Sequence, residues 1–138
     1  MDGCPSERKQ VPLSNTTCIF CNIEQDRIIL EDQSFIIIRD VYPVTFLHTL
    51  IIPKRHIETY FDLSAKEIIG LNKILLDEKI HLEREDASIT GFNIGMNCGK
   101  DAGQTVMHCH IHLIPRRKSD VDDPRGGVRG VIPNKQKY

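Results

Sequence analysis

The stretch that decides the fold runs from residue 97 to residue 116 and has the sequence N-C-G-K-D-A-G-Q-T-V-M-H-C-H-I-H-L-I-P-R. Three histidines in it alternate with apolar residues, in the order His108, Cys109, His110, Ile111, His112 and Leu113. In a strand, successive side chains point to opposite faces, so the imidazoles would share one face while the apolar residues pack on a core. On a helix, residues two apart lie roughly 200° from each other, which would scatter the histidines. The pattern therefore predicts a strand.

The residues just before the histidines predict an anion-binding loop. Gly99 and Gly103 are followed by Gln104 and Thr105, and such a loop can present backbone N–H groups and a hydroxyl to an oxyanion. Pro115 is expected to end the strand. Because titratable imidazoles rarely cluster without a use, the stretch indicates phosphate chemistry or a metal site rather than a chance polar face of an edge strand.

The rest of the chain predicts an α+β fold, with an antiparallel sheet of about five strands and one long helix. Apolar segments indicate strands at residues 28–31, 34–39, 47–53 and 89–96, in addition to the histidine strand. The strands and the helix do not alternate as βαβ units, which argues against a parallel sheet. We expect one domain at 16–117, preceded by a mobile leader at 1–15 and followed by an extended, irregular tail at 118–138.

The long helix is expected at residues 64–84. Ser64 and Glu67 have the spacing of a capping box, and apolar residues recur after them at intervals of three and four. The stripe expected to cover the sheet consists of Ile68, Leu71, Ile74, Leu75 and Leu82. The helix residues expected to face water are Lys66, Lys73, Glu78, His81 and Glu83.

The composition is that of an ordinary globular protein, with 138 residues, 40% of them hydrophobic and 27% charged. The net charge of −1 gives no electrostatic case for a nucleic-acid polymer or an anionic membrane as a partner. No apolar run approaches the roughly 20 residues that span a bilayer, and no secretory signal is evident. The five cysteines do not follow a disulfide framework, so a reducing, cytoplasmic location is expected.

Two of these cysteines, in the motif Cys18-x-x-Cys21, have the spacing that lets one turn present two thiolates to a tetrahedral metal. A redox pair with this spacing would need a preceding strand and a following helix, and the sequence predicts neither here. A zinc site would need two further nitrogen or sulfur ligands. Reduced thiols without a metal are the alternative.

The segment H-C-H-I-H-L-I at 108–114, with G-Q-T-V before it and P-R after it, resembles the signature of the histidine-triad (HIT) nucleotide hydrolases and transferases. The similarity extends from Cys18 to Pro115. It implies a hydrolase that releases a nucleoside monophosphate, AMP in the first instance, from a nucleoside-phosphate-X substrate. X would be a nucleotide, as in a dinucleoside polyphosphate, or an amine, as in a phosphoramidate.

The resemblance also implies which residues act on the phosphates. His110 would be the nucleophile that carries a nucleotidyl intermediate, and His112 would donate a hydrogen bond to the α-phosphate. His108 would lie behind them and fix their geometry. Gln104 and Thr105 would contact the phosphates, with Thr105 near the leaving group.

The nucleoside would be held by a second group of residues on the same resemblance. Asp40 would bind the ribose hydroxyls, Asn97 would contact the substrate, and the base would lie among Phe20, Ile23, Ile38 and Val41. His48 would support the site from behind. Without the resemblance, Asp40 could be a turn residue and the four apolar residues could be plain core.

The branch of the family that this chain resembles contains diadenosine tetraphosphate hydrolase-like proteins and binds zinc. By that resemblance, His56 and His108 would join Cys18 and Cys21 in a structural site without an open position for water. Family members usually pair as twofold dimers, so a homodimer is implied as well.

Two other functions remain as alternatives. One is a zinc-stabilised nucleotide-binding or regulatory module with little turnover. The other is a metallohydrolase whose ligands are the three triad histidines, although three ligands on one flat strand converge poorly on one ion. The tail contains Arg125 and Arg129 beside glycines, which could clamp distal phosphates, pack across a dimer partner or belong to a disordered tail.

Overall fold

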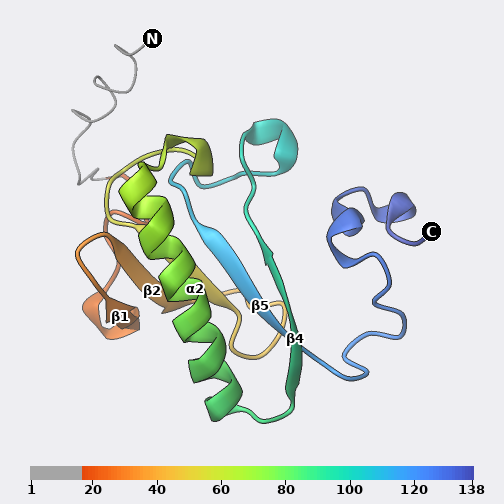
Figure 1. The fold of residues 1–138 in the computed structure, drawn as a ribbon. Coiled ribbons are helices and arrows are strands. Elements are labelled where there is room, and N and C mark those ends of the chain that lie inside the picture. Colours follow the sequence, from red (N-terminus) through yellow and green to blue (C-terminus); the bar gives the residue numbers. More distant parts are fainter. Residues whose placement is uncertain (1–16) are drawn as a thin grey trace.

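The computed structural model describes residues 17–138, so the leader expected at 1–15 lies outside the described residues. One long helix and five strands are joined by loops and short 3₁₀ turns (Figure 1). The strands are β1 (Ile28–Glu31), β2 (Phe35–Arg39), β3 (Thr49–Pro53), β4 (Ile89–Gly95) and β5 (Ile111–Arg117), and the helix is α2 (Ala65–Glu85). The predicted α+β fold is confirmed. Among residues 17–138, no helix has both the length and the apolar character needed to cross a membrane.

The five strands form one antiparallel sheet in the order β1-β2-β3-β5-β4. β1 and β2 are consecutive and pair as a hairpin, whereas β5 lies between β3 and β4. The registers align Ile28, Ile38, Leu50 and His112 in one row that crosses four strands. This row connects the β1 edge of the sheet to the histidine segment.

The two faces of the sheet have different partners. Helix α2 lies across one face (Figure 1), and the buried cluster beneath it contains Phe35, Ile37, Ile51, Leu71, Ile74, Cys109 and Ile111. On the opposite face, the buried cluster contains Phe20, Ile38, Leu50 and Ile52. Because His112 is in register with Leu50, and side chains alternate along a strand, His112 belongs to this second face. His112 thus lies on the face opposite α2, while Cys109 and Ile111 pack beneath the helix, as the alternation predicts.

Helix α2 begins at the predicted capping box. The Ser64 hydroxyl accepts a hydrogen bond from the Glu67 amide at 3.1 Å, and the Glu67 carboxylate accepts one from the Ser64 amide at 2.8 Å. The buried helix residues are Glu67, Leu71, Ile74, Glu78 and Leu82. Two expectations were wrong: Ile68 is 37% exposed, and Glu78 is 1% exposed. Spacings of three and four residues put Glu78 on the face of Ile74 and Leu82.

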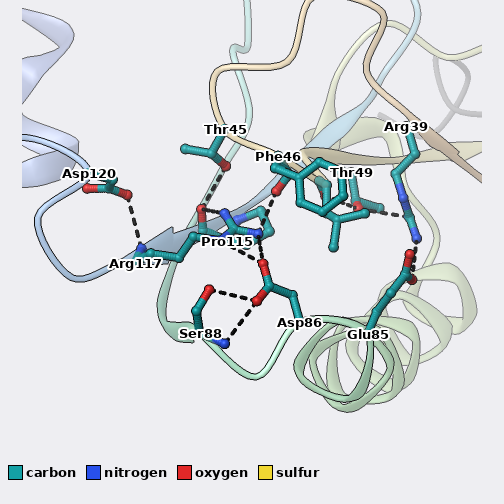
Figure 2. A network of polar contacts seen from close by, with 11 residues as sticks. Arg39, Thr45, Phe46, Thr49, Glu85, Asp86, Ser88, Pro115, Arg117 and Asp120 are labelled. Carbon is teal, nitrogen blue, oxygen red and sulfur yellow. Dashed lines mark hydrogen bonds and ion pairs between the residues drawn. The ribbon is translucent and has the colours of Figure 1, made fainter.

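The buried Glu78 carboxylate faces β2. Its Oε1 lies 3.8 Å from Arg39 Nη1 and, within the described chain, has no hydrogen bond. Arg39 also donates to the Thr49 hydroxyl at 3.0 Å and pairs with Glu85 at 3.7 Å (Figure 2). Glu78 Oε2 lies 3.1 Å from Nδ1 of His81, so His81 contacts a buried acid as well as water.

Strand β5 begins and ends later than the sequence predicts. It covers Ile111–Arg117, so His112 lies within it, while His108 and His110 precede it and Pro115 is internal. Pro115 pairs with β4, whereas pairing with β3 ends at Thr49 and Leu113. The Pro115 carbonyl instead accepts from the Thr45 hydroxyl at 2.7 Å (Figure 2). Proline is tolerated here because no β3 residue requires its missing N–H.

The segment after β5 folds back beside β4 (Figure 1) and contains two 3₁₀ turns, Gly127–Val131 and Pro133–Lys135, so the expected extended tail was wrong. Ion pairs stabilise the beginning of this C-terminal segment. Arg116 pairs with Asp120 at 2.8 Å, which keeps the pKa of Asp120 well below its usual value. Arg117 pairs with Asp86 at 2.9 Å and donates to the Phe46 carbonyl at 2.9 Å (Figure 2).

Candidate active site and zinc centre

A cavity of about 380 Å³ opens on the sheet face opposite α2, a size typical of sites for small ligands. The predicted site residues that line it are Phe20, Asp40, Val41, Asn97, Thr105, His110 and His112. Ile23 and Ile38, predicted to contact the base, instead pack with Phe20 behind this lining. Other lining residues, among them Arg27, Tyr42 and Val44, had no motif that could single them out in the sequence.

A second cavity of about 590 Å³ adjoins the first. It lies between β4 and the C-terminal segment and is lined mainly by apolar residues such as Ile94, Met96, Val121 and Val128. Both cavities share Val44, Asn97 and His112. A molecule bound in the first cavity therefore has room to extend past His112 into the second.

His110 has a fixed tautomer. Its Nδ1 lies 2.8 Å from the carbonyl oxygen of His108. A carbonyl only accepts hydrogen bonds, so Nδ1 carries a proton, and in the neutral ring Nε2 keeps its lone pair. The ring packs against Phe20, with 5.0 Å between centroids, and lies 5.3 Å from the ring of His112. The neutral form of His110 thus has its unprotonated nitrogen on a ring that lines the cavity.

The contact with His48 determines the tautomer of His112. The Val44 amide donates to His48 Nδ1 at 3.1 Å, so the proton of a neutral His48 is on Nε2. That nitrogen lies 2.9 Å from His112 Nδ1, which must then accept and leave the His112 proton on Nε2. Burial lowers the pKa of His48, and burial, His110 and His48 together lower the pKa of His112 to about 4. Both rings are therefore neutral near pH 7.

Asp40 is both a turn residue and a cavity residue. Its Oδ1 accepts from the Tyr42 amide at 2.9 Å, and its Oδ2 lies 3.5 Å from His48 Nε2 and 4.0 Å from His112 Nδ1. A carboxylate can accept about four hydrogen bonds, so it retains free acceptor positions toward the cavity. The sequence left open whether Asp40 is a turn residue or a ligand-binding residue, and the structure is compatible with both roles.

The glycine loop is built differently from the prediction. The Gln104 side chain is 4% exposed; its oxygen accepts from the Gly99 amide, and its nitrogen donates to the carbonyls of Glu58 and Val106. Both polar atoms of the side chain are therefore bonded to the backbone, and the contact of Gln104 with a phosphate stays a prediction. The amides of Ala102, Gly103 and Gln104 are also bonded within the loop. Of the predicted donors, the exposed Thr105 lines the cavity.

Behind the cavity, the sulfur atoms of Cys18 and Cys21 converge with Nδ1 of His56 and His108, all four ligand atoms lying within 4.8 Å of one another. His108 Nδ1 lies 3.4 Å from Cys18 Sγ and 3.2 Å from His56 Nδ1, and Cys21 Sγ lies 3.2 Å from His56 Nδ1. Tetrahedral zinc with its usual bond lengths would separate two nitrogens by about 3.3 Å and a nitrogen from a sulfur by about 3.6 Å. The four residues therefore fit a closed zinc site.

His108 links this centre to the nucleophile. Its Nε2 donates to the Pro53 carbonyl at 2.8 Å, which leaves Nδ1 free to bind a metal. Burial lowers its pKa to about 4, so the ring is neutral as a ligand must be. Its own carbonyl accepts the Nδ1 proton of His110. A metal bound to His108 would thus fix the position of the backbone carbonyl that determines the tautomer of His110.

The three triad histidines do not converge on one point. His108 groups with the two cysteines and His56, while His112 groups with His48 and Asp40. Among the described residues, no such group contains all three, which argues against a metal bound by the whole triad. Cys98 and Cys109 are outside the zinc group, and burial raises the pKa of the Cys109 thiol to about 12.

Known proteins are similar to the chain in sequence and in fold. The HIT domain matches residues 22–119 of the chain. A zinc-bound histidine triad protein from Mycobacterium smegmatis is 37% identical, with a TM-score of 0.66 over 75% of this chain and 78% of that one.

Two further solved structures are similar to the same degree. A hypothetical histidine triad nucleotide-binding protein from Sulfolobus tokodaii is 35% identical, with a TM-score of 0.64 over 77% of this chain and 73% of that one. A HIT family hydrolase from Legionella pneumophila is 33% identical, with a TM-score of 0.62 over 77% of this chain and 98% of that one. Residues 22–119 make up most of the chain, and the chain therefore belongs to the HIT family.

Proposed function

We propose that the protein is a nucleotidyl hydrolase that releases a nucleoside monophosphate from nucleoside-phosphate-X substrates. The observation that carries this proposal is the 2.8 Å contact between His110 Nδ1 and the His108 carbonyl, which leaves Nε2 as the nucleophilic nitrogen of the neutral ring. The hydrolase from L. pneumophila and the nucleotide-binding protein from S. tokodaii support the reaction class and the ligand class. Adenine nucleotides are the first substrates to test, as the resemblance implies.

The reaction has two steps. His110 Nε2 attacks the α-phosphorus and the bond from phosphorus to X breaks. A phosphate X leaves as an anion, and an amine X takes a proton from water. Water then attacks the phosphorus, the bond to His110 breaks, and the nucleoside monophosphate leaves with the imidazole restored. His112 Nε2–H and the Thr105 hydroxyl donate to the phosphoryl oxygens, where negative charge increases in the transition state. The second cavity gives X room beside His112.

The nucleoside would be held on the other side of the phosphate. Asp40 accepts hydrogen bonds from the ribose hydroxyls, Asn97 contacts the substrate, and Phe20 and Val41 enclose the base, with Ile23 and Ile38 supporting Phe20. Zinc on Cys18, Cys21, His56 and His108 would be structural, since all four tetrahedral positions belong to protein ligands. A twofold homodimer is proposed on the resemblance to the family.

The test is release of AMP from diadenosine tetraphosphate and from adenosine phosphoramidate by the pure protein. We expect one of the two to be cleaved, and His110→Ala to lower the rate at least 1000-fold because no nucleophile remains, a loss of the size seen for other catalytic nucleophiles. His81→Ala, on the outer part of α2, is the matched histidine control and should keep the full rate. Tight AMP binding without product would instead favour the binding-module alternative.

A further inference from the structure

Arg27 is a cavity residue to which the proposed chemistry gives no role. It ends the short turn Gln25–Arg27, directly before β1, and it lines the cavity together with Phe20, Asp40 and Val41. It is half-buried, and within residues 17–138 its guanidinium makes no hydrogen bond or ion pair. A guanidinium with five N–H donors and no protein partner, beside a ligand cavity, is available to bind an acceptor-rich ligand.

The sheet register shows which part of a nucleotide would meet Arg27. Its neighbour Ile28 begins the row that continues through Ile38 and Leu50 to His112. Adjacent strands are about 4.8 Å apart, so the backbone at Arg27 lies roughly 14 Å from that at His112. Asp40 Oδ2 lies only 4.0 Å from His112, so the ribose site is next to the phosphate site. Arg27 is consequently at the far end of the cavity, where the base would lie.

We propose that Arg27 binds the edge of a purine and makes the site prefer 6-oxopurine nucleotides, such as guanine and hypoxanthine nucleotides, over adenine nucleotides. The O6 and N7 atoms of guanine are two adjacent acceptors, which match the two-pronged guanidinium. Adenine offers N7 as an acceptor, but its N6 amino group is a donor that would face the guanidinium N–H groups. The inference rests on the proposed function for the location of the base, and adenine substrates are accepted less well rather than excluded.

The experiment is calorimetric titration of GMP, IMP and AMP into the full, zinc-loaded chain. Wild type should bind GMP and IMP roughly tenfold more tightly than AMP, within the range that one bidentate arginine contact gives. IMP lacks the 2-amino group, so equal affinities for IMP and GMP assign the preference to O6 and N7. Arg27→Met should weaken GMP and IMP binding about tenfold and leave AMP unchanged. Arg84→Met, an exposed arginine on α2, is the matched control and should change nothing.

Other results would overturn the inference. Equal affinity of wild type for GMP and AMP would exclude base discrimination, even if the Arg27 variants failed to fold. Equal weakening of all three nucleotides by Arg27→Met, restored by Arg27→Lys, would show that the positive charge acts on the phosphate. If Arg27 instead recognises the base, Arg27→Lys should not restore nucleotide binding, because lysine lacks the planar set of N–H donors of a guanidinium. If none of the three nucleotides bound, the proposed function would be wrong as well as this inference. The experiment therefore distinguishes a failure of the inference alone from a failure of both.

Discussion

The tautomer of His112 is the residue-scale feature on which transition-state stabilisation would depend. His48 Nε2 donates to His112 Nδ1 at 2.9 Å, and the backbone amide of Val44 fixes the tautomer of His48. His48→Ala should therefore lower kcat about 10–100-fold, the usual cost of losing such a supporting contact, with little change in KM. ¹⁵N NMR of labelled protein should show the proton of neutral His112 on Nε2 in wild type and a mixture of the Nδ1–H and Nε2–H tautomers in the variant.

Replacing His48 with glutamine tests whether the effect of His48 on His112 depends on the N–H group that it donates. His48→Gln can still offer an N–H to His112, so part of the activity should return while the ring packing with His112 is lost. An unchanged kcat in His48→Ala, or a wild-type protein with the His112 proton on Nδ1, would contradict the assignment. His81→Gln, on α2, serves as the histidine control.

At the scale of elements, the ion pair between half-buried Arg39 and buried Glu78 joins β2 to α2. Removing Arg39 leaves a carboxylate that is 1% exposed without its cation, and such losses destabilise a protein strongly. Arg39 is itself 26% exposed, so we expect Arg39→Met to lower the free energy of unfolding by about 2 kcal/mol, below the range for fully buried pairs. Urea denaturation measures this change.

The double variant Arg39→Met/Glu78→Met separates charge from packing. Because replacing both ions by apolar groups removes the buried charge, it should be more stable than Arg39→Met alone. Lys73→Met, which breaks the exposed Lys73–Asp77 pair, should leave stability unchanged within error. A double variant that is less stable than Arg39→Met would contradict this account of Glu78.

The candidate zinc site would act at the scale of the whole molecule, because its ligands come from parts of the chain that are 87 to 90 residues apart. It connects the turn at Cys18 and Cys21 to His56 and to the approach to β5. Metal removal by a chelator, or Cys18→Ser, should lower Tm by about 10 °C or more, since each kcal/mol shifts Tm by a few degrees in a domain of this size. Calorimetry and metal analysis on the same samples give both quantities.

Cys98→Ser is the matched control for this prediction, because Cys98 lies outside the zinc group. It should keep one zinc ion per chain and an unchanged Tm. A Cys18→Ser protein that keeps its zinc and its Tm would contradict the assignment. Loss of zinc should also change the ¹⁵N signals of His110, since the His108 carbonyl holds its Nδ1 proton.

The sequence by itself determined the features that depend on local periodicity and capping. Alternation from His108 to Leu113 predicted which side chains share a face, and Ser64 with Glu67 predicted where α2 begins. The resemblance to the HIT family added Asp40 and Asn97, which line the cavity, and His56 and His108, which join Cys18 and Cys21 in the candidate metal group. Local patterns succeed here because side-chain direction follows directly from backbone geometry.

Only the tertiary structure decided how polar side chains are used. Gln104 and Thr105 are neighbours in the sequence, yet the Gln104 amide bonds three backbone groups of the protein, whereas Thr105 lines the cavity. The buried Glu78 meets its cation, Arg39, only because β2 packs against α2, and Arg27 lines the cavity beside the paired strands β1 and β2. The role of a polar group depends on partners that are distant in sequence, because hydrogen bonds and ion pairs form only where the fold brings donor and acceptor together.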